Sequence, residues 1–428
     1  MSWLQILRLG LVQMALGSIV VLTTATMNRV MVVELAFPAT LPGLLVSVYY
    51  ATQFLRPKFG HGADQGGRRT PWILGGVFVL AAGAVGAAGA VWIMGVRPGL
   101  GILVAVPSFV LIGLGIGAAG TNLLALLAAR VSEGRHAAAG SAVWIMMIFG
   151  LAATGITAGL LLDPYSPARL LAVTLGTATV AVLLAVIGVW GQERGPTRPP
   201  PPRAVNFGRI ARELLADRRV RAFTAFVFAS MLAYNLQDLI LEPYAGHVFG
   251  MTVGESTALG GTMHAGALSG MIVVLLFGSA LARWIPVPVR VWIVSGCVVS
   301  GLALTAMAFG GLQAETWPLT PNVFVLGFAN GIFAVAAIGA MMTLAREGDE
   351  AREGARMGIF GAAQAIAFGL GALLGTLAAD VMRGLVSDAA LAYGTVFVIE
   401  GAIFLVAAVL ALRLTSAEQS HRTLVPGE

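Results

Sequence analysis

The chain has 428 residues, of which 58% are hydrophobic and only 11% are charged, and its mean hydropathy is +0.88. Soluble domains carry about 25% charged residues, so composition excludes a soluble protein and predicts an all-α, polytopic membrane protein. The single cysteine, Cys297, excludes a disulfide framework and a cysteine-based metal site. The net charge of +6 comes from Lys and Arg residues that follow membrane topology, so we expect no nucleic-acid partner.

Apolar stretches recur along the chain at the length of membrane spans. Crossing the hydrocarbon core of a bilayer takes about 20 helical residues, and twelve stretches meet this length. The first six predicted spans are 8–33, 40–59, 72–95, 101–128, 139–162 and 168–190. The second six are 222–246, 256–282, 291–312, 321–344, 357–382 and 390–413.

The basic residues predict the orientation of these spans. If the N-terminus is cytoplasmic, all 26 Lys and Arg residues except Arg29, Arg97, Arg169 and Arg383 lie on the inner side. Cytoplasmic loops are enriched in Lys and Arg, so both termini are predicted to be cytoplasmic.

A Pro- and Arg-rich segment divides the chain into two sets of six spans. We expect an N-terminal bundle over 1–190, a cytoplasmic linker over 191–221, a C-terminal bundle over 222–414 and a tail over 415–428. Within the linker, residues 207–219 fit either a basic amphipathic helix on the inner leaflet or a solvated connection. Asn28 in span 1 and Glu34 just beyond it have approximate counterparts in Asn235 and Glu242 in span 7, which predicts two six-helix pseudo-repeats.

The loop between spans 2 and 3 indicates the fold family. Its sequence, GHGADQGGRRTP, resembles the loop signature of the major facilitator superfamily, and we therefore expect that fold. In this signature Asp is suited to capping a helix and the arginines to binding carbonyls or lipid phosphates. The loop acts either as a latch for alternating access or as a structural clamp. The residues that match are Gly60, Asp64, Gly67, Arg68 and Arg69.

Polar and charged side chains inside spans are the candidate functional residues. Carboxylates there are costly and usually face a protein interior or an aqueous cavity. One interpretation pairs Arg29 with Asp238 or Glu242 across a central cavity. The other lets Arg29 and Glu34 snorkel to the outer interface. The residues expected at the central cavity are Asn28, Arg29, Glu34, Asn235, Gln237, Asp238, Glu242, Asn122, Asn330 and Gln364, with Thr121 as a further polar neighbour.

Two histidines are candidate ligands for the magnesium of a chlorin. His264 lies within span 8, where a neutral imidazole in an apolar pocket suits a metal, and His247 lies near the outer surface. The sequence contains neither a phosphate-binding loop nor a dinucleotide fingerprint nor a zinc-protease motif, so we expect no catalysis, no intrinsic cofactor and no resident metal. The glycine-rich run 113–120 lies inside a span and is interpreted as helix packing.

Four segments resemble one family over nearly the whole chain. NRVMVVEL from Asn28, GTNLLALLA from Gly120, QDLILEPYAGHVFGMTVGEST from Gln237 and NGIFAVAAIGAMM from Asn330 are similar to the PucC and LhaA group. That group comprises major-facilitator-like proteins of photosynthetic membranes. The resemblance implies a factor that delivers bacteriochlorophyll, or an isoprenoid-tailed precursor, to light-harvesting or reaction-centre polypeptides. Geranylgeranyl reductase and bacteriochlorophyll synthase are further partners that it implies, through a branch linked to late pigment synthesis.

Three mechanisms remain open from the sequence. A pigment chaperone would hold a chlorin and its tail against apolar, Gly-rich walls and needs no coupled ion. A secondary transporter would use Asp238, Glu242 or Glu34 for proton coupling. A scaffold would bind partner helices and no pigment.

Overall fold

The computed structural model of the chain describes residues 1–56, 58–60, 63, 68–132, 135–193, 214–278, 287–346 and 353–423, and the regular structure in these ranges is helical. Within these ranges, ten helices are long and apolar enough to cross a membrane, and the broken pair Val220–Leu239 and Leu241–Phe249 makes eleven. The second predicted span begins with α3 (Thr40–Thr52), which has 13 residues. Part of the chain after it, around the signature loop, lies outside the described residues. The predicted polytopic helical fold is confirmed.

Contacts divide the chain into two compact units. Unit 1 comprises Met1–Pro201 and Asp238–Ala265, and unit 2 comprises Pro202–Gln237 and Gly266–Glu428. Unit 1 therefore includes a segment that follows the linker in the chain, where the sequence predicted a boundary at the linker itself. Most of the predicted linker, including the start of the proposed amphipathic helix, lies outside the described residues.

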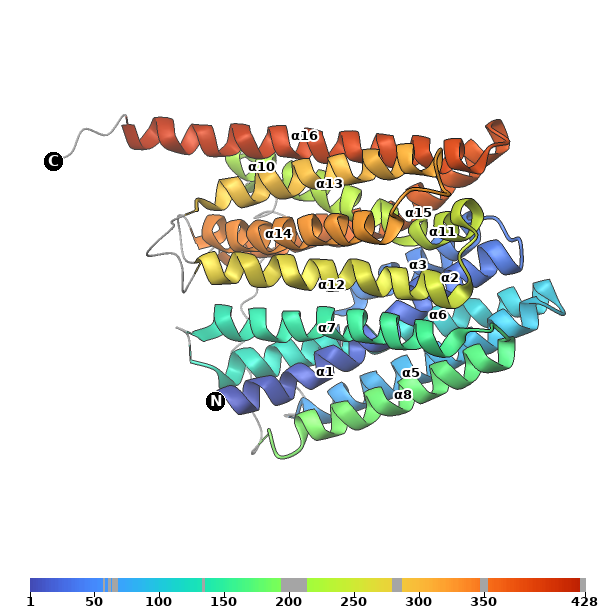
Figure 1. Cartoon of the computed structure of the whole chain (residues 1–428). Coiled ribbons are helices and arrows are strands. Elements are labelled where there is room, and N and C mark those ends of the chain that lie inside the picture. The colour runs from blue at the N-terminus through green and yellow to red at the C-terminus, as the bar shows by residue number, and fades with distance from the viewer. Residues whose placement is uncertain are drawn as a thin grey trace. The chain divides into compact units, whose positions relative to one another are not determined.

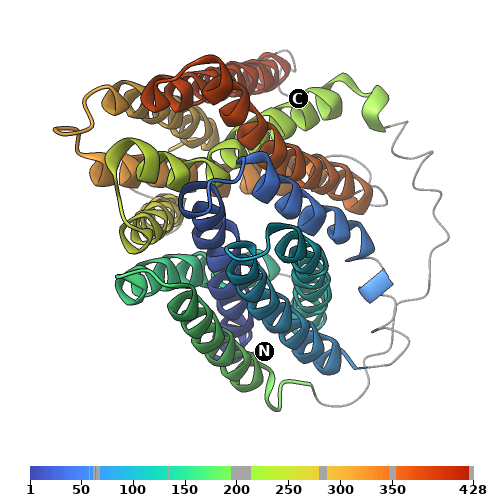
Figure 2. The ribbon, with the colours of Figure 1, turned by 90° about the vertical axis from the view of Figure 1, so that its right-hand side faces the viewer.

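Unit 1 is built from the helices of the first six spans together with parts of spans 7 and 8. Within it, α1 packs against α7 and α8, and α5 packs against α6 and α8. The same helices are seen after a 90° turn in Figure 2. Labelled as in Figure 1, the elements are α1 (Trp3–Val21), α2 (Met27–Arg29), α3, α5 (Thr70–Met94), α6 (Pro98–Arg130), α7 (His136–Leu162), α8 (Pro167–Val189), α11 (Leu241–Phe249) and the start of α12 (Val253–Gly278).

Glycines bring α5 and α6 into close contact. A methyl group added to Gly76 would lie 2.6 Å from the backbone nitrogen of Ala119, and one added to Gly83 would lie 2.8 Å from that of Ile112. On the opposite helix, a methyl group on Gly115 would lie 2.6 Å from the carbonyl oxygen of Gly76. The glycine-rich run in span 4 is thus a packing surface, as predicted, because small residues let membrane helices approach closely.

Unit 2 has an aromatic core. Phe333 of α14 meets Phe226 of α10 and Phe404 of α16 edge-on, with ring centroids 6.3 and 6.2 Å apart. Such edge-to-face pairs add to the hydrophobic contribution of buried aromatic rings. The last helix continues to Thr423, so the predicted tail begins inside it. The helices are α10 (Arg218–Leu236), the rest of α12, α13 (Val289–Gly311), α14 (Leu319–Arg346), α15 (Glu353–Leu385) and α16 (Ala389–Thr423).

Candidate functional site in unit 1

The backbone of span 1 widens on both sides of its polar residues. Wider π-helical turns cover Leu22–Thr26 and Val30–Glu34, and the short helix α2 between them carries Asn28 and Arg29. Wider turns of this kind occur frequently at functional sites in proteins. Hydroxyl groups assist the change locally, because Thr23 donates to the carbonyl of Val20 at 2.8 Å. Asn28 and Arg29 are therefore presented by an irregular stretch of a long helix.

Span 7 is interrupted, where the sequence predicted one continuous helix. A 3-10 turn, Gln237–Leu239, separates α10 from α11, and Ile240 caps the new helix. Helix α11 ends at Gly250, whose φ of 65° is a left-handed conformation that favours glycine. The interruption leaves the Leu239 carbonyl available, and the chain turns after α11. The carbonyls of Leu239 and Met251 can therefore accept hydrogen bonds from span 1.

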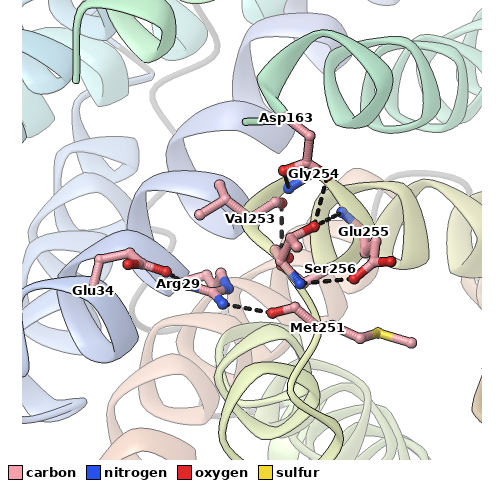
Figure 3. A network of polar contacts seen from close by, with 9 residues as sticks. Arg29, Glu34, Asp163, Met251, Val253, Gly254, Glu255 and Ser256 are labelled. Atoms are coloured by element: carbon pink, nitrogen blue, oxygen red, sulfur yellow. Dashed lines mark hydrogen bonds and ion pairs between the residues drawn. The ribbon is translucent and has the colours of Figure 1, made fainter. Parts of the chain in front are cut away.

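Arg29 links span 1 to the turn that follows α11. Its Nη1 donates to Glu34 Oε1 at 2.6 Å, and its Nη2 donates to the Met251 carbonyl at 2.7 Å (Figure 3). The expected pairing of Arg29 with Asp238 or Glu242 is wrong, because the ion pair is made with Glu34, five residues along the same span. The snorkelling interpretation of Arg29 is wrong too, since its side chain is only 3% exposed whereas Glu34 is 39% exposed.

Asn28 and Glu242 complete a polar core, which we define as Asn28, Arg29, Glu34 and Glu242; three of these residues are buried, and Glu34 lies at the exposed edge. Asn28 Nδ2 donates to the Leu239 carbonyl at 2.6 Å, so a side chain of span 1 caps the interruption of span 7. Glu242 is 2% exposed, and neither of its carboxylate oxygens accepts a hydrogen bond from a described residue. The structure thus brings together four of the residues predicted for the central cavity.

A second polar group holds the start of α12. Thr252 and Glu255 form a capping box in which the Thr252 N–H donates to Glu255 Oε2 at 2.8 Å and the Glu255 N–H to Thr252 Oγ1 at 3.1 Å. Asp163, from the end of α7, accepts the Thr252 hydroxyl at 2.6 Å and the Gly254 N–H at 3.0 Å (Figure 3). We call Asp163, Thr252 and Glu255 the α12 clasp. The turn Gly250–Thr252 is therefore held from one side by Arg29 and from the other by Asp163.

Small residues allow α12 to lie directly against α7. A methyl group on Gly159 would lie 2.6 Å from the Gly254 carbonyl, and one on Gly261 would lie 2.5 Å from the Ile156 nitrogen. A buried hydroxyl pair adds a polar contact to span 1, since Thr257 Oγ1 donates to Thr26 Oγ1 at 3.1 Å. The tight seam fixes the position of α12 beside the polar core.

The remaining predicted residues of unit 1 lie apart from these hydrogen bonds. Asp238 is half-buried and makes no hydrogen bond or ion pair with any residue in the described ranges. Asn122 donates to the Ala118 carbonyl of its own helix at 3.0 Å, and Thr121 beside it is half-buried. His247 and His264 are half-buried in α11 and α12.

Unit 2 contains four of the residues predicted for the cavity. Asn235 donates to the Phe368 carbonyl at 2.7 Å, and Asn330 accepts the Ser300 hydroxyl at 2.8 Å. Gln364 faces the sulfur of Met231 at 3.7 Å, while Gln237 is 1% exposed with no partner for its Oε1 among the described residues. Asn235, Asn330 and Gln364 therefore join helices within this unit, which is the structural role that polar residues often have in membrane bundles.

The signature loop is described only in part. Asp64 and Gly67 lie outside the described residues, and Gly60 has only ordinary contact with Thr121. Arg68 is exposed, whereas Arg69 is buried and its N–H donates to Glu193 Oε1 at 2.7 Å. The Thr70 N–H donates to Glu193 Oε2 at 2.9 Å, so Glu193 caps the start of α5.

The Glu193 carboxylate lies outside the spans and is held ionised. Burial opposes its charge, but the N–H groups of Arg69 and Thr70, with the nearby charge of Arg68, outweigh burial and lower the Glu193 pKa below its ordinary value. This contact joins the last part of the signature segment, Arg69 and Thr70, to the chain that follows span 6.

Sequence reasoning missed Asp163, Thr252, Glu255 and Glu193. The pattern Thr252-Val-Gly-Glu255 is a capping box that could have been found, because Thr followed three residues later by Glu marks a helix start. Asp163 and Glu193 have no such local signal, since their partners lie 89 and 124 residues away.

The class of protein follows from the fold. The chain matches solved structures of major facilitator transporters over nearly its whole length. One is a bacterial homologue of the human lysosomal transporter Spinster, in an inward-facing and occupied conformation, with a TM-score of 0.72, 14% identity and coverage of 96% of each chain. Another is a D-xylose–proton symporter, with a TM-score of 0.71, 14% identity and coverage of 95% and 96%. The fold is therefore that of a major facilitator membrane protein.

The family is narrower than the fold. Residues 26–419 match the PUCC protein family, and the chain belongs to it. It is 50% identical to the bacteriochlorophyll synthase 44.5 kDa chain of Rhodobacter capsulatus, over the full length of both chains. It is also 29% identical to protein PucC of the same species, covering 96% of this chain and 92% of that protein.

Proposed function

We propose that this protein binds bacteriochlorophyll or an isoprenoid-tailed precursor in the photosynthetic membrane and hands it to other proteins without chemical change. The observation that carries the proposal is the full-length identity of 50% to a chain whose name places it with bacteriochlorophyll. The named synthase activity is not transferred, because the major facilitator fold of this chain is shared with transporters and its spans contain no catalytic motif in sequence.

An apolar groove in unit 1 supports the binding of a hydrocarbon tail. The groove has a volume of about 440 Å³ and is lined by α1, α7 and α8, with small residues such as Gly176 and Ala172 and the hydroxyl-bearing Thr154 and Thr157. None of the described residues that line it is charged. Ligand pockets usually span about 300–1,000 Å³ and are mostly apolar, so a tail with few polar atoms suits this groove.

His264 is the better of the two candidate magnesium ligands. It is half-buried in α12 and makes no hydrogen bond within the described part of the chain, which leaves an imidazole nitrogen for a metal. His247 has other interactions in α11. In this proposal the pigment is cargo, and the protein carries no intrinsic cofactor.

The proposed partners are those that the family resemblance implies. Light-harvesting or reaction-centre polypeptides, or the late enzymes geranylgeranyl reductase and bacteriochlorophyll synthase, would receive the pigment. The proposed location is the bacterial inner membrane, including its photosynthetic extensions, with both termini in the cytoplasm as the basic residues indicate.

A second candidate function is proton-coupled transport of a small or lipid-like molecule. The specific observation that favours it is the buried carboxylate of Glu242, which has no hydrogen-bond partner among the described residues. Ionisable residues inside spans commonly mark ion or proton pathways. Proton flux in reconstituted vesicles, measured with and without pigment, separates this function from pigment handling.

The test of the first proposal is the absorbance of the detergent-purified protein from photosynthetically grown cells. We expect a red bacteriochlorophyll-type band in near-stoichiometric amount. Gly176→Leu should fill the groove and reduce this band, whereas Gly89→Leu, on α5 with the same open surroundings, should not. Purified protein that carries partner subunits but no pigment would contradict the proposal and favour a scaffold.

A further inference from the structure

Glu242 is the one residue of the polar core whose charge is not matched. Its side chain is 2% exposed, and both carboxylate oxygens lack a hydrogen-bond donor among the described residues. A methyl group added to Gly260 of α12 would lie 2.6 Å from Glu242 Oε1, so the carboxyl group rests against the bare backbone of that helix. The described surroundings of this carboxyl group therefore offer it no hydrogen-bond donor.

An ionised carboxylate in such a place is strongly disfavoured. Moving an unpaired charge out of water is strongly unfavourable even after the protein relaxes, and the group takes up a proton instead. In this arrangement the Glu242 side chain is therefore a protonated carboxylic acid and not a carboxylate.

Arg29, the cation of the polar core, is committed to other partners. A methyl group on Gly246 would lie 3.0 Å from Arg29 Nη2, and Gly246 follows Glu242 by one turn on the same face of α11. One turn is about 5.4 Å along the helix, which a change of arginine rotamer can span. Yet Arg29 donates to Glu34 and to the Met251 carbonyl, and only its Nε lacks a partner in the described chain.

Few other ionisable groups face this position. The charges whose field reaches Glu242 are Arg29 and Asp238, and Glu34 lies beyond Arg29 at the exposed edge. From α12, Gly260 lies against Glu242, and His264 follows Gly260 by one turn of that helix. Besides α11, the helices α5 and α7 pack against the irregular part of span 1; α5 has no ionisable residue, and α7 has only His136, at its first position.

We propose that Glu242 is a proton-binding site that controls the partners of Arg29. With the proton bound, Arg29 holds Glu34 and the Met251 carbonyl, as in Figure 3. When the proton leaves to water, the carboxylate attracts Arg29, which gives up the Met251 carbonyl. The turn Gly250–Thr252 is then held only by the α12 clasp. The inference shares Glu242 with the second candidate function, proton-coupled transport, but it requires neither transport nor a particular cargo.

The proton itself is tested by infrared spectroscopy of the full-length protein in lipid nanodiscs. The carbonyl stretch of a protonated carboxyl group is absent from a carboxylate, so Glu242→Gln should remove one such band at neutral pH. Glu34→Gln, the same change in the ion-paired residue of the core, should leave the band in place. An unchanged spectrum in Glu242→Gln would mean that Glu242 is ionised and would overturn the proposal.

The control of Arg29 is tested by the mobility of a spin label at Val248→Cys, in the last turn of α11, with Cys297→Ser as background. Raising the pH should increase label mobility in the otherwise native protein and leave it low in Glu242→Gln. Arg29→Gln should give high mobility at every pH. Equal pH dependence with and without Glu242 would contradict the proposal. Glu242→Met, which is neutral and of similar size, provides the same comparison if the amide is not accommodated.

Discussion

Two consecutive glycines in α12 should respond differently to the same substitution. A methyl group on Gly260 would meet Glu242 Oε1 at 2.6 Å, which is the end of a flexible side chain. A methyl group on Gly261 would meet the Ile156 nitrogen at 2.5 Å and the Gly155 carbonyl carbon at 2.8 Å, which are backbone atoms of α7. The first neighbour can move by rotation about side-chain bonds, whereas the second requires a shift of a whole helix.

The expected magnitudes follow from these contacts. Alanine is favoured over glycine in a helix by about 0.5–1 kcal/mol, and overpacking costs about 1–3 kcal/mol. Gly261→Ala should therefore destabilise the protein by about 1–2 kcal/mol, because the helix gain offsets only part of the overpacking. Gly260→Ala should change stability by less than about 1 kcal/mol, but it should displace the Glu242 carboxyl group.

Thermal unfolding in detergent, followed by tryptophan fluorescence, measures the difference. A change of 1 kcal/mol shifts Tm by roughly 2–4 °C in larger domains, so Gly261→Ala should unfold several degrees below Gly260→Ala. Gly89→Ala, on α5 with no atom within 4 Å of the added methyl group, is the control for helix propensity alone. Equal Tm values for Gly261→Ala and Gly89→Ala would refute the close seam between α7 and α12.

Three further changes test other parts of the structure. Asp163→Ala removes two hydrogen bonds from the α12 clasp and should lower stability by about 1–3 kcal/mol, measured by the same unfolding assay; a neutral result would contradict the clasp. Glu193 has a lowered pKa in the folded state, so its stabilisation is full above its ordinary pKa of 4.5 and is lost as the pH falls from there through the lowered folded-state pKa. Glu193→Gln should flatten this acid-side loss of Tm, and an unchanged pH profile would contradict the cap. Asp238→Asn should impair proton flux and pigment-complex accumulation if Asp238 takes part in proton coupling, and unchanged values of both would exclude that role.

The spans could be predicted from the sequence because hydropathy depends on composition over many residues. The irregular turns in spans 1 and 7 could not, since widening a helix around Asn28 or breaking it at Gln237–Leu239 leaves the composition of the span unchanged. Asn28, Arg29, Glu34 and Glu242 were recognised because polar residues are rare in spans.

The partners of these residues were not predictable. Arg29 binds Glu34 and the Met251 carbonyl, which is 222 residues away. Every residue has a backbone carbonyl, so the sequence does not show which one accepts a hydrogen bond. Asp163 and Glu193 likewise bind backbone N–H groups that only the folded chain brings near. Sequence reasoning therefore found most of the polar core but not the contacts that hold it.

Pigment binding by the isolated protein tests the central claim most directly. Bacteriochlorophyll would be titrated into lipid nanodiscs that contain the full-length protein, and into empty nanodiscs of the same lipid, with pigment fluorescence as the readout. The proposed function predicts saturable binding above the empty-disc background, near one pigment per protein, and weaker binding by Gly176→Leu than by Gly89→Leu. Pigment uptake equal to that of empty nanodiscs would contradict it.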